Sequence, residues 1–333
     1  MKINSYAAFE PKSQLDKYQY EAIPLGPEDL RVKVSYCGIC HSDIHLIDND
    51  WAISQYPLIA GHEIIGVITD LGERVSGFNI GDRVGIGWQC DSCLHCEWCL
   101  QGKENLCDHN QAVALGHFGG FAEYVQTNQR FAFTIPQNLS SENAAPLLCG
   151  GITVYSPLHV CNITPNMKIA VVGIGGLGHL ALQFYRAFGC EVTALSSTAT
   201  KEKDAYQFGA HHFAIAVGND FFKQYAGQFD VIVSTVPQNL PWEKFLSLLR
   251  PLGQLCILGV ASEVKFNPMS LIIGNKKICG SGIGDSKTIK EMLAFAALHN
   301  ITAQTKIFPI DEINSAIQLV KENKVFYRAV LKY

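Results

Sequence analysis

The 333-residue sequence predicts an α/β protein with two domains, a β-rich part followed by a doubly wound parallel sheet. Its length exceeds the size at which a single hydrophobic core keeps growing, which favours two cores. Pro and Gly are scattered through the first 150 residues, as in small barrel-like folds with long loops. From about residue 150, short apolar runs alternate with helical stretches, and repeated βα units of this kind build a parallel sheet.

Strand and turn signals can be placed along the chain. In the first part, strands are predicted over 32–36 and 64–68, with turns at Gly72, Gly77, Gly81 and Gly85. In the second part, strands are predicted over 168–172, 191–195, 229–233, 254–258 and 277–280, and helices over 180–188, 202–208 and 242–249. Two further helices (288–299 and 310–322) and a strand (328–331) form a tail that we expect to return to the first domain.

The composition is that of an ordinary globular protein, with 48% hydrophobic and 17% charged residues. The net charge of −4 and the absence of a Lys/Arg cluster argue against a nucleic-acid partner. No apolar run is as long as a membrane span, and the first residues show no signal-peptide pattern, so we expect a cytoplasmic protein with no membrane partner. In that reducing compartment, clustered thiols among twelve cysteines indicate metal binding rather than disulfides.

Four of the cysteines stand at C-x2-C-x2-C-x7-C spacing: Cys93, Cys96, Cys99 and Cys107. Thiols this close in sequence can converge on one tetrahedral Zn2+, because short loops lose little entropy on closure. A closed set of four leaves no open coordination position, so we predict a structural zinc. The rival interpretation, a zinc-ribbon module that contacts nucleic acid or protein, requires a basic face, but this lobe carries Asp91, Glu97, Glu104 and Asp108.

A glycine-rich turn follows the predicted strand 168–172 and opens a helix, which is the context that gives G-x-G-x-x-G its meaning. Gly173 permits the tight turn, Gly175 allows backbone to approach a pyrophosphate, and Gly178 allows close helix–strand packing. Gly176 and Leu177 complete the turn, and the helix N-terminus offers N–H donors to phosphates.

The next strand ends where an NAD enzyme places an acidic residue against the ribose hydroxyls. This chain has Ser196, Ser197, Thr198 and Lys201 there instead. Hydroxyls and an ammonium group bind a 2′-phosphate that a carboxylate would repel. The alternative is that these residues form a polar surface turn with no ligand. We predict that the chain binds NADP(H) rather than NAD(H).

A second group of thiol, imidazole and carboxylate residues does not follow a known metal-binding spacing. Residues 37–45 contain two thiols, two imidazoles and a hydroxyl; His62 and Glu63 follow, and Cys149 stands much later. A catalytic zinc takes three protein ligands and keeps one open position. Spacing alone does not select three ligands from twelve cysteines and eleven histidines.

Longer motifs resolve that choice: CGICHSDIH (37–45), GHEIIGV (61–67), IGDRV (80–84), the four-cysteine lobe, APLLCGGITVYSPL (145–158) and GIGGLGH (173–179). In these motifs and their order the chain resembles the zinc-dependent medium-chain alcohol dehydrogenases, most closely the cinnamyl alcohol dehydrogenase-like branch. The resemblance extends to the C-terminus. It implies a GroES-like β-barrel catalytic domain (1–149 and 286–333) and a Rossmann NADP-binding domain (150–285).

The resemblance also implies roles for single residues. Cys40, His62 and Cys149 would hold the catalytic zinc, with Glu63 as an alternative ligand during exchange. Ser42 corresponds to the relay hydroxyl at the reacting oxygen, His45 to the outer relay histidine, and Asp43 to the carboxylate that orients His62. Residues expected near the nicotinamide are Thr153, Val260 and Ser281.

The implied activity is a zinc-dependent alcohol dehydrogenase or aldehyde reductase that uses NADP(H), with two zinc ions per chain. Its substrates would be primary alcohols and aromatic or medium aliphatic aldehydes, bound in a pocket between the domains. Trp51 and Trp88 would line this pocket, unless they are plain core aromatics. Relatives pair edge strands of the cofactor domains, which favours a homodimer, with a tetramer as the alternative. A zinc-free quinone reductase and an NAD-linked polyol dehydrogenase are the rivals.

Other cysteines and histidines receive ordinary explanations. Five cysteines are expected to pack as small hydrophobic side chains: Cys37, Cys161, Cys190, Cys256 and Cys279. Cys90 could compete for the structural metal. The pair His211–His212 is expected in a polar loop, and His95 and His109 are expected to face solvent.

Overall fold

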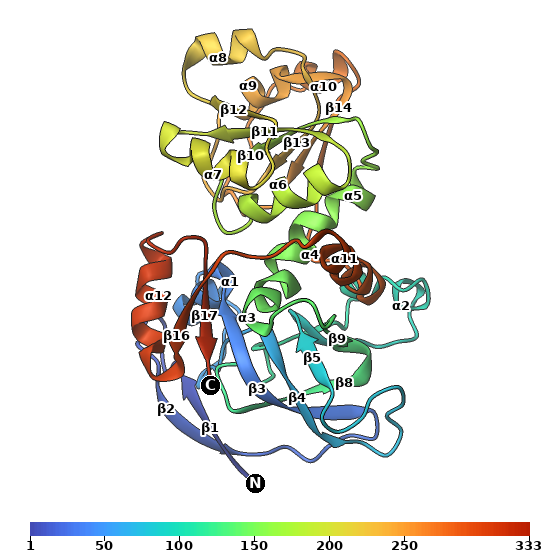
Figure 1. The fold of residues 1–333 in the computed structure, drawn as a ribbon, viewed down its shortest axis with the longest axis vertical. Coiled ribbons are helices and arrows are strands. Elements are labelled where there is room, and N and C mark those ends of the chain that lie inside the picture. The colour runs from blue at the N-terminus through green and yellow to red at the C-terminus, as the bar shows by residue number, and fades with distance from the viewer. The chain divides into compact units, whose positions relative to one another are not determined.

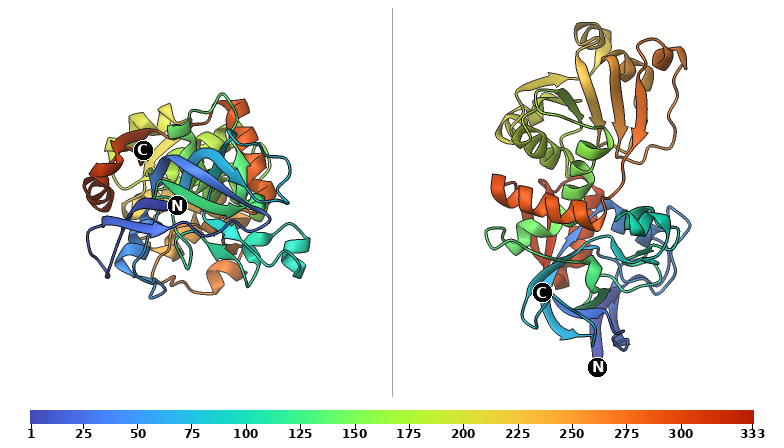
Figure 2. Two further views of the ribbon diagram at one scale, coloured as in Figure 1. Left: turned by 90° about the horizontal axis from the view of Figure 1, so that it is seen from below. Right: turned by 90° about the vertical axis from the view of Figure 1, so that its right-hand side faces the viewer.

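The computed structural model describes residues 1–333, and its contacts divide the chain into two compact units. Unit 1 comprises Met1–Ile152 and Gly284–Tyr333, and unit 2 comprises Thr153–Ile283. The first junction falls inside helix α4 (Gly150–Tyr155), so the boundaries lie two or three residues from the expected 149/150 and 285/286. Both termini lie in unit 1 (Figure 2). None of the helices combines the length and apolar character that a membrane crossing requires.

Unit 1 is built on a mostly antiparallel sheet of seven strands, ordered β16-β17-β3-β4-β5-β9 with β8 also paired to β3. Its strands are β3 (Asp29–Ile39), β4 (Glu63–Leu71), β5 (Arg83–Ile86), β8 (Tyr124–Asn128), β9 (Ala132–Thr134), β16 (Thr305–Pro309) and β17 (Arg328–Lys332). β17 runs antiparallel to β3 with Leu331 opposite Cys37, so the C-terminal tail does return to the first part of the chain.

Two small two-stranded antiparallel sheets and several helices complete unit 1. Their strands are β1 (Lys2–Ala7) with β2 (Asp16–Glu21), and β6 (Gln89–Asp91) with β7 (Gln111–Ala112). The helices are α1 (His41–Asp48), α2 (Glu97–Leu100), α3 (Ser141–Ala144), α11 (Ser286–His299) and α12 (Ile313–Lys321). Alternate residues of β3 such as Val32 and Val34 are buried, which gives the sheet its core face.

One of the predicted turns is wrong. Gly85 lies inside β5, where an added Cβ would stand 2.6 Å from Leu148 Cδ1. The glycine is needed there because the 3-10 helix Ala145–Leu148 approaches the strand closely, not because the chain turns.

Unit 2 is a six-stranded parallel sheet ordered β12-β11-β10-β13-β14-β15, which confirms the doubly wound fold. The strands are β10 (Lys168–Val172), β11 (Glu191–Ser196), β12 (His212–Ile215), β13 (Phe229–Ser234), β14 (Leu249–Ile257) and β15 (Lys277–Gly280). The helices are α5 (Pro157–Val160), α6 (Gly178–Ala187), α7 (Glu202–Gln207), α8 (Gly218–Gln224), α9 (Trp242–Ser247) and α10 (Met269–Ile272). Figure 1 shows α6 and α7 on one side of this sheet and α8, α9 and α10 on the other.

The expected polar loop at His211–His212 is wrong, because His212 begins β12 and pairs with Thr193 of β11. His211 precedes the strand, and its Nδ1 lies 3.0 Å from the Val192 backbone N–H, from which it accepts a hydrogen bond. β12 is a four-residue edge strand with only Ala214 fully buried. Such a strand leaves almost no hydrophobic period in the sequence.

Candidate active site and metal centres

A mixed cluster of thiol, imidazole and carboxylate groups lies in unit 1. The ligand atoms of Cys40, His62, Glu63 and Cys149 all lie within 4.8 Å of one another. They come from separate places: Cys40 caps the N-terminus of α1, His62 and Glu63 stand at the start of β4, and Cys149 follows the 3-10 helix Ala145–Leu148. The Cys40 and Cys149 Sγ atoms are 3.8 Å apart.

Asp43 organises this cluster from α1. Its Oδ1 is 2.7 Å from His62 Nδ1 and accepts from the Gly61 N–H at 2.9 Å, and its Oδ2 accepts from the Cys40 N–H at 2.9 Å. Asp43 and His62 are both fully buried. Because Nδ1 faces Asp43, the other ring nitrogen, Nε2, points into the cluster, and this buried atom has no hydrogen-bond partner. An unpaired buried imidazole nitrogen beside two thiols fits a zinc ligand.

Electrostatics in the cluster also favour a cation. A hydrogen bond from Cys149, helped by His62, lowers the pKa of Cys40 well below its usual range despite burial. Burial alone would lower the pKa of His62, but the Asp43 carboxylate raises it well above the ordinary value. The cluster thus gathers negative charge around the His62 ring, and a bound dication would take the place of its proton.

Glu63 is held by Arg328, a residue that the sequence analysis did not single out. Arg328 on β17 donates to Glu63 Oε1, and both side chains are buried. Burial raises the pKa of Glu63 to about 7, although the Arg328 guanidinium lowers it. Glu63 Oε2 has no hydrogen-bond partner, so it remains available as a ligand. Gly38 makes room for it, since a Cβ there would stand 2.0 Å from Oε2.

The two expected relay residues lie on the helix that Cys40 caps. Ser42 is half-buried in the first turn of α1, and its backbone N–H lies 3.5 Å from Cys40 Sγ. His45 Nδ1 is 2.7 Å from Oδ2 of Asp50, a second partner not anticipated from the sequence.

Two tryptophans surround the same residues. The Trp88 ring meets His62 edge-on with centroids 5.0 Å apart, and Trp51 lies 5.2 Å from His45. The two indoles are themselves 6.4 Å apart. Trp88 therefore borders the mixed cluster at His62, whereas Trp51 borders His45, and both indoles also pack on the core.

The four predicted lobe thiols form a separate cluster. Cys93, Cys96, Cys99 and Cys107 also lie within 4.8 Å of one another, with Cys93 Sγ 3.9 Å from Cys99 and 3.5 Å from Cys107. The backbone N–H of His95, together with the neighbouring thiols, lowers the pKa of Cys93 to about 6. Cys90 is outside this cluster, and its thiol donates to the Gln111 carbonyl. His95 and His109 are exposed.

The glycine-rich turn of unit 2 contains two kinds of glycine. Gly173 and Gly178 are packed closely against the protein, whereas Gly175 faces open space. Gly173 has φ +89°, and a Cβ there would stand 2.4 Å from Val236; a Cβ at Gly178 would stand 1.9 Å from the Gly173 carbonyl. Around Gly175, by contrast, no atom from beyond its two chain neighbours lies within 4 Å of the Cβ position. The space beside Gly175 and the N-terminus of α6 thus fits the pyrophosphate of a dinucleotide.

The end of β11 presents hydroxyl groups and a lysine but no carboxylate. Ser196 Oγ accepts from the Thr198 N–H at 3.2 Å, and Thr198 Oγ1 is 2.8 Å from Thr200 Oγ1. Ser197 is exposed and Lys201 is half-buried, and burial lowers the pKa of Lys201.

The other expected cofactor residues lie in the same unit. Thr153 is half-buried in α4, and Val260 is 70% exposed after β14. Ser281 follows β15, and its buried Oγ has no hydrogen-bond partner. Gly176 and Leu177 are partly exposed at the start of α6.

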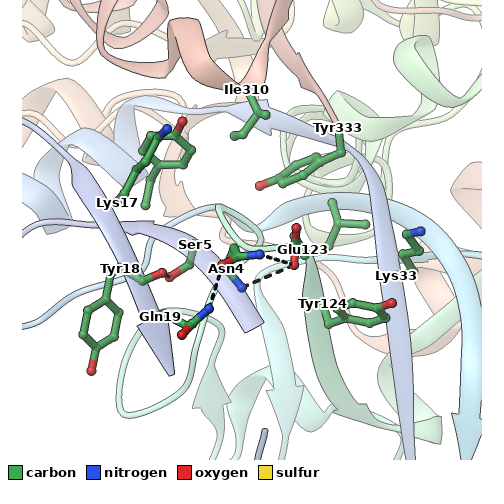
Figure 3. Close-up of a pocket in the computed structure, with 12 residues that line it drawn as sticks. Asn4, Ser5, Lys17, Tyr18, Gln19, Lys33, Glu123, Tyr124, Ile310 and Tyr333 are labelled. Carbon is green, nitrogen blue, oxygen red and sulfur yellow. Dashed lines mark hydrogen bonds between the residues drawn. The ribbon is translucent and has the colours of Figure 1, made fainter. Parts of the chain in front are cut away.

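A cavity of about 610 Å3 lies elsewhere in unit 1 (Figure 3). Its lining includes Tyr18, Glu123 and Tyr333, and Glu123 accepts hydrogen bonds from Asn4. None of the clustered thiols, imidazoles or carboxylates described above lines it, so it is not where these groups act.

Sequence reasoning missed three features: Arg328, Asp50 and a third thiol cluster in unit 2, formed by Cys161, Cys256 and Cys279. The arginine that begins the apolar run Ala329–Leu331 was a signal for Arg328. No signal pointed to the thiol cluster, because its members are far apart in sequence. Cys37 and Cys190 are buried outside any such cluster, as ordinary packing residues would be.

The family models and two curated relatives that match this chain are all alcohol dehydrogenases or related reductases. The family models "Alcohol dehydrogenase GroES-like domain" and "Zinc-binding dehydrogenase" match residues 26–137 and 176–297. The aldehyde reductase AdhA of Synechocystis sp. is 40% identical over 332 residues, 99% of each chain. A probable mannitol dehydrogenase of Fragaria ananassa is 39% identical over 341 residues, 99% of this chain and 95% of the relative.

Solved structures agree over the whole chain. A cinnamyl alcohol dehydrogenase from Sorghum bicolor has a TM-score of 0.95 at 37% identity, covering 100% of this chain and 98% of the other. CAD from Helicobacter pylori, solved with NADP(H), has a TM-score of 0.92 at 31% identity, with the same coverage. Near-complete coverage at these identities leaves no room for a different fold. The chain belongs to the zinc-dependent medium-chain alcohol dehydrogenases, in the cinnamyl alcohol dehydrogenase-like branch.

Proposed function

We propose that the chain transfers a hydride between NADP(H) and a primary alcohol or aldehyde, aromatic or medium aliphatic, as a zinc-dependent alcohol dehydrogenase. The observation that carries this proposal is the convergence of the partly exposed Cys40 with the buried His62 and Cys149, in which His62 Nε2 lacks a partner. When bound, zinc supplies Lewis acidity toward a carbonyl oxygen, and NADPH supplies the hydride. Cys93, Cys96, Cys99 and Cys107 would hold a second, structural zinc.

Within the reactive set, each neighbour has a definite task. Asp43 fixes the orientation of the His62 imidazole and keeps Nε2 directed at the cluster. Glu63 is the reserve ligand that can replace a departing group, and Arg328 holds its carboxylate in place. Because three residues and not four are required, one coordination position remains for the substrate.

Ser42 and His45 would move the proton. They lie three residues apart on α1 and therefore on one side of the helix. Ser42 Oγ can exchange a proton with the reacting oxygen, and the half-exposed His45 can pass it to water. The 2.7 Å contact between Nδ1 and Asp50 orients the His45 ring for this transfer.

The preference for NADP(H) follows from the end of β11. Hydroxyl groups of Ser197 and Thr198 can donate to a 2′-phosphate, and a phosphate beside Lys201 would offset the desolvation that lowers its pKa. The NADP(H) bound in the Helicobacter pylori CAD supports the same choice.

Replacing Ser197 tests this choice directly. Ser197→Asp should reduce kcat/KM with NADPH by about tenfold or more, because a carboxylate there repels the 2′-phosphate. The ratio of kcat/KM values for NADPH and NADH is the measurement, and Ser197→Ala is the matched control without the charge. An unchanged ratio in the aspartate variant would mean that another loop reads the phosphate.

The reaction itself is tested by initial rates of NADPH and NADH consumption with benzaldehyde, cinnamaldehyde, butanal and a quinone. Fast oxidation of NADPH with the aldehydes supports the proposal, and activity with the quinone alone contradicts it. Trp51 and Trp88 would favour apolar substrates as walls of the pocket. Because one relative is named a probable mannitol dehydrogenase, mannitol oxidation with NAD+ and NADP+ belongs in the same panel.

We also propose that the chain forms a homodimer. β15 ends the sheet of unit 2, so its outer edge can pair with the same edge of a second copy. The molar mass measured by light scattering should be twice that of the 36.6 kDa chain; four times would indicate the tetramer.

A further inference from the structure

Unit 2 contains a third thiol cluster that the proposed reaction does not use. The Sγ atoms of Cys161, Cys256 and Cys279 all lie within 4.8 Å of one another, and those of Cys161 and Cys279 are 3.4 Å apart. Cys161 and Cys256 are fully buried, whereas Cys279 is partly exposed. The cluster shares no residue with either candidate zinc site of unit 1.

The fold brings these three thiols together from distant parts of the chain. Cys256 on β14 stands directly opposite Cys279 on the neighbouring parallel strand β15. Side chains at such paired positions point to the same face, with backbones about 4.8 Å apart. Cys161 ends helix α5, and its carbonyl accepts from Gln254 Nε2 at 2.9 Å. Because Gln254 is two residues before Cys256 on β14, this bond holds Cys161 over the same face.

The Sγ–Sγ distance in this cluster is similar to those in the two candidate zinc sites of unit 1. Cys93 and Cys107 are 3.5 Å apart, and Cys40 and Cys149 are 3.8 Å apart. Thiolates around one ion at about 2.3 Å lie about 4 Å from each other, so small inward or outward shifts would suffice. Packing alone accounts for a buried cysteine but not for three sulfur atoms that converge, and Cys190 in the same unit shows the ordinary case.

We propose that Cys161, Cys256 and Cys279 form a trigonal binding site for one Cu(I) ion. Thiolates prefer soft cations, and structural Zn2+ takes four ligands, whereas no fourth cysteine, histidine or carboxylate joins this group. The partly exposed Cys279 gives the ion a way in. This site does not depend on the proposed function.

The first test measures metal content of the intact zinc-loaded protein. Without oxygen, the protein is exposed to Cu(I) held by a competing chelator such as bicinchoninate, desalted, and analysed for copper and zinc. We expect one retained copper per chain with no loss of zinc. No retained copper, or copper gained in step with zinc released, would overturn the proposal.

Variants locate the ion. Cys279→Ser and Cys161→Ala should each abolish retention of the copper, and Cys190→Ala, a buried cysteine of the same unit outside the cluster, should retain it. Unchanged zinc content and melting temperature without copper establish that each variant is folded. Retention of copper by a folded Cys279→Ser protein would contradict the assignment.

X-ray absorption on the copper-loaded wild-type protein gives a readout that needs no variant. Three sulfur neighbours at one distance are expected. Two sulfur neighbours, or any oxygen or nitrogen neighbour, would rule out the trigonal site.

Discussion

The two thiol-containing clusters of unit 1 differ in how the chain assembles them. The four lobe thiols lie within fifteen residues, between Cys93 and Cys107, and a short loop can bring them together with little help from the rest of the fold. The mixed cluster draws on residues 40, 62, 63 and 149, and it needs β3, β4, α1 and the 3-10 helix before Cys149 in register. The first cluster is therefore local, and the second exists only in the folded unit.

Burial and hydrogen bonding follow the same division. In the lobe, Cys93 and Cys96 are partly exposed, and the contacts are mostly from neighbouring backbone N–H groups. In the mixed cluster, His62, Glu63 and Cys149 are buried, and Asp43 and Arg328 support them through side chains. A local cluster suits a structural metal, and a buried, externally supported one suits chemistry.

The largest effect should separate the two clusters by activity. Cys40→Ala should lower kcat/KM for aldehyde reduction by at least about 10^3-fold, about 4 kcal/mol, because the zinc proposed to polarise the carbonyl would lose a ligand. The folded variant should keep one zinc per chain in the lobe. Cys90→Ala, which removes a buried thiol outside both clusters, should keep two zinc ions and full activity. Wild-type rates in the Cys40 variant would contradict the division of roles.

Next in size is the loss of the lobe metal. Cys99→Ala should destabilise the protein by about 3 kcal/mol or cause aggregation, since structural zinc contributes directly to folding free energy. Denaturant unfolding and zinc content measure this, again against Cys90→Ala. A variant that loses zinc but unfolds like the wild type would show that the lobe metal has no structural role.

Removing the guanidinium tests the support of the mixed cluster. Arg328→Met should lower the free energy of unfolding by about 3 kcal/mol, because it leaves the buried Glu63 carboxylate without its partner. Adding Glu63→Gln should recover most of that loss in the unfolding free energy, since both charges are then gone. If the double variant is as unstable as the single one, packing and not charge explains the effect.

The smallest expected effect concerns the orientation of one ligand. Asp43→Asn should weaken zinc binding at the mixed cluster by about 10- to 100-fold, because the amide cannot supply the charge that holds His62. Zinc retained at fixed chelator concentration measures this, and the lobe zinc of the same protein is the internal control. Equal loss from both sites would show a general disturbance of unit 1.

Much of the fold could be predicted from the sequence. The strands β10, β13 and β15 were placed within a residue of their observed ends. β10 and β13 are central strands, and their apolar runs are buried on both faces. β12 and α8 were missed, since short, largely exposed elements at the sheet edge carry weak hydrophobic periods. The turn predicted at Gly85 was wrong because glycine is required both at turns and where two elements pack closely, and the sequence does not distinguish the two cases.

By itself, the sequence determined the local features of this protein: the four-thiol spacing, the glycine-rich turn and the hydroxyls after β11. Each depends on neighbouring residues, so spacing carries the information. Only the tertiary structure decided the non-local ones, namely the Asp43–His62–Cys40 arrangement, the Arg328–Glu63 pair and the three-thiol cluster. Apart from the neighbours Cys40 and Asp43, their members are 19 or more residues apart, and strand register and helix placement bring them within bonding distance.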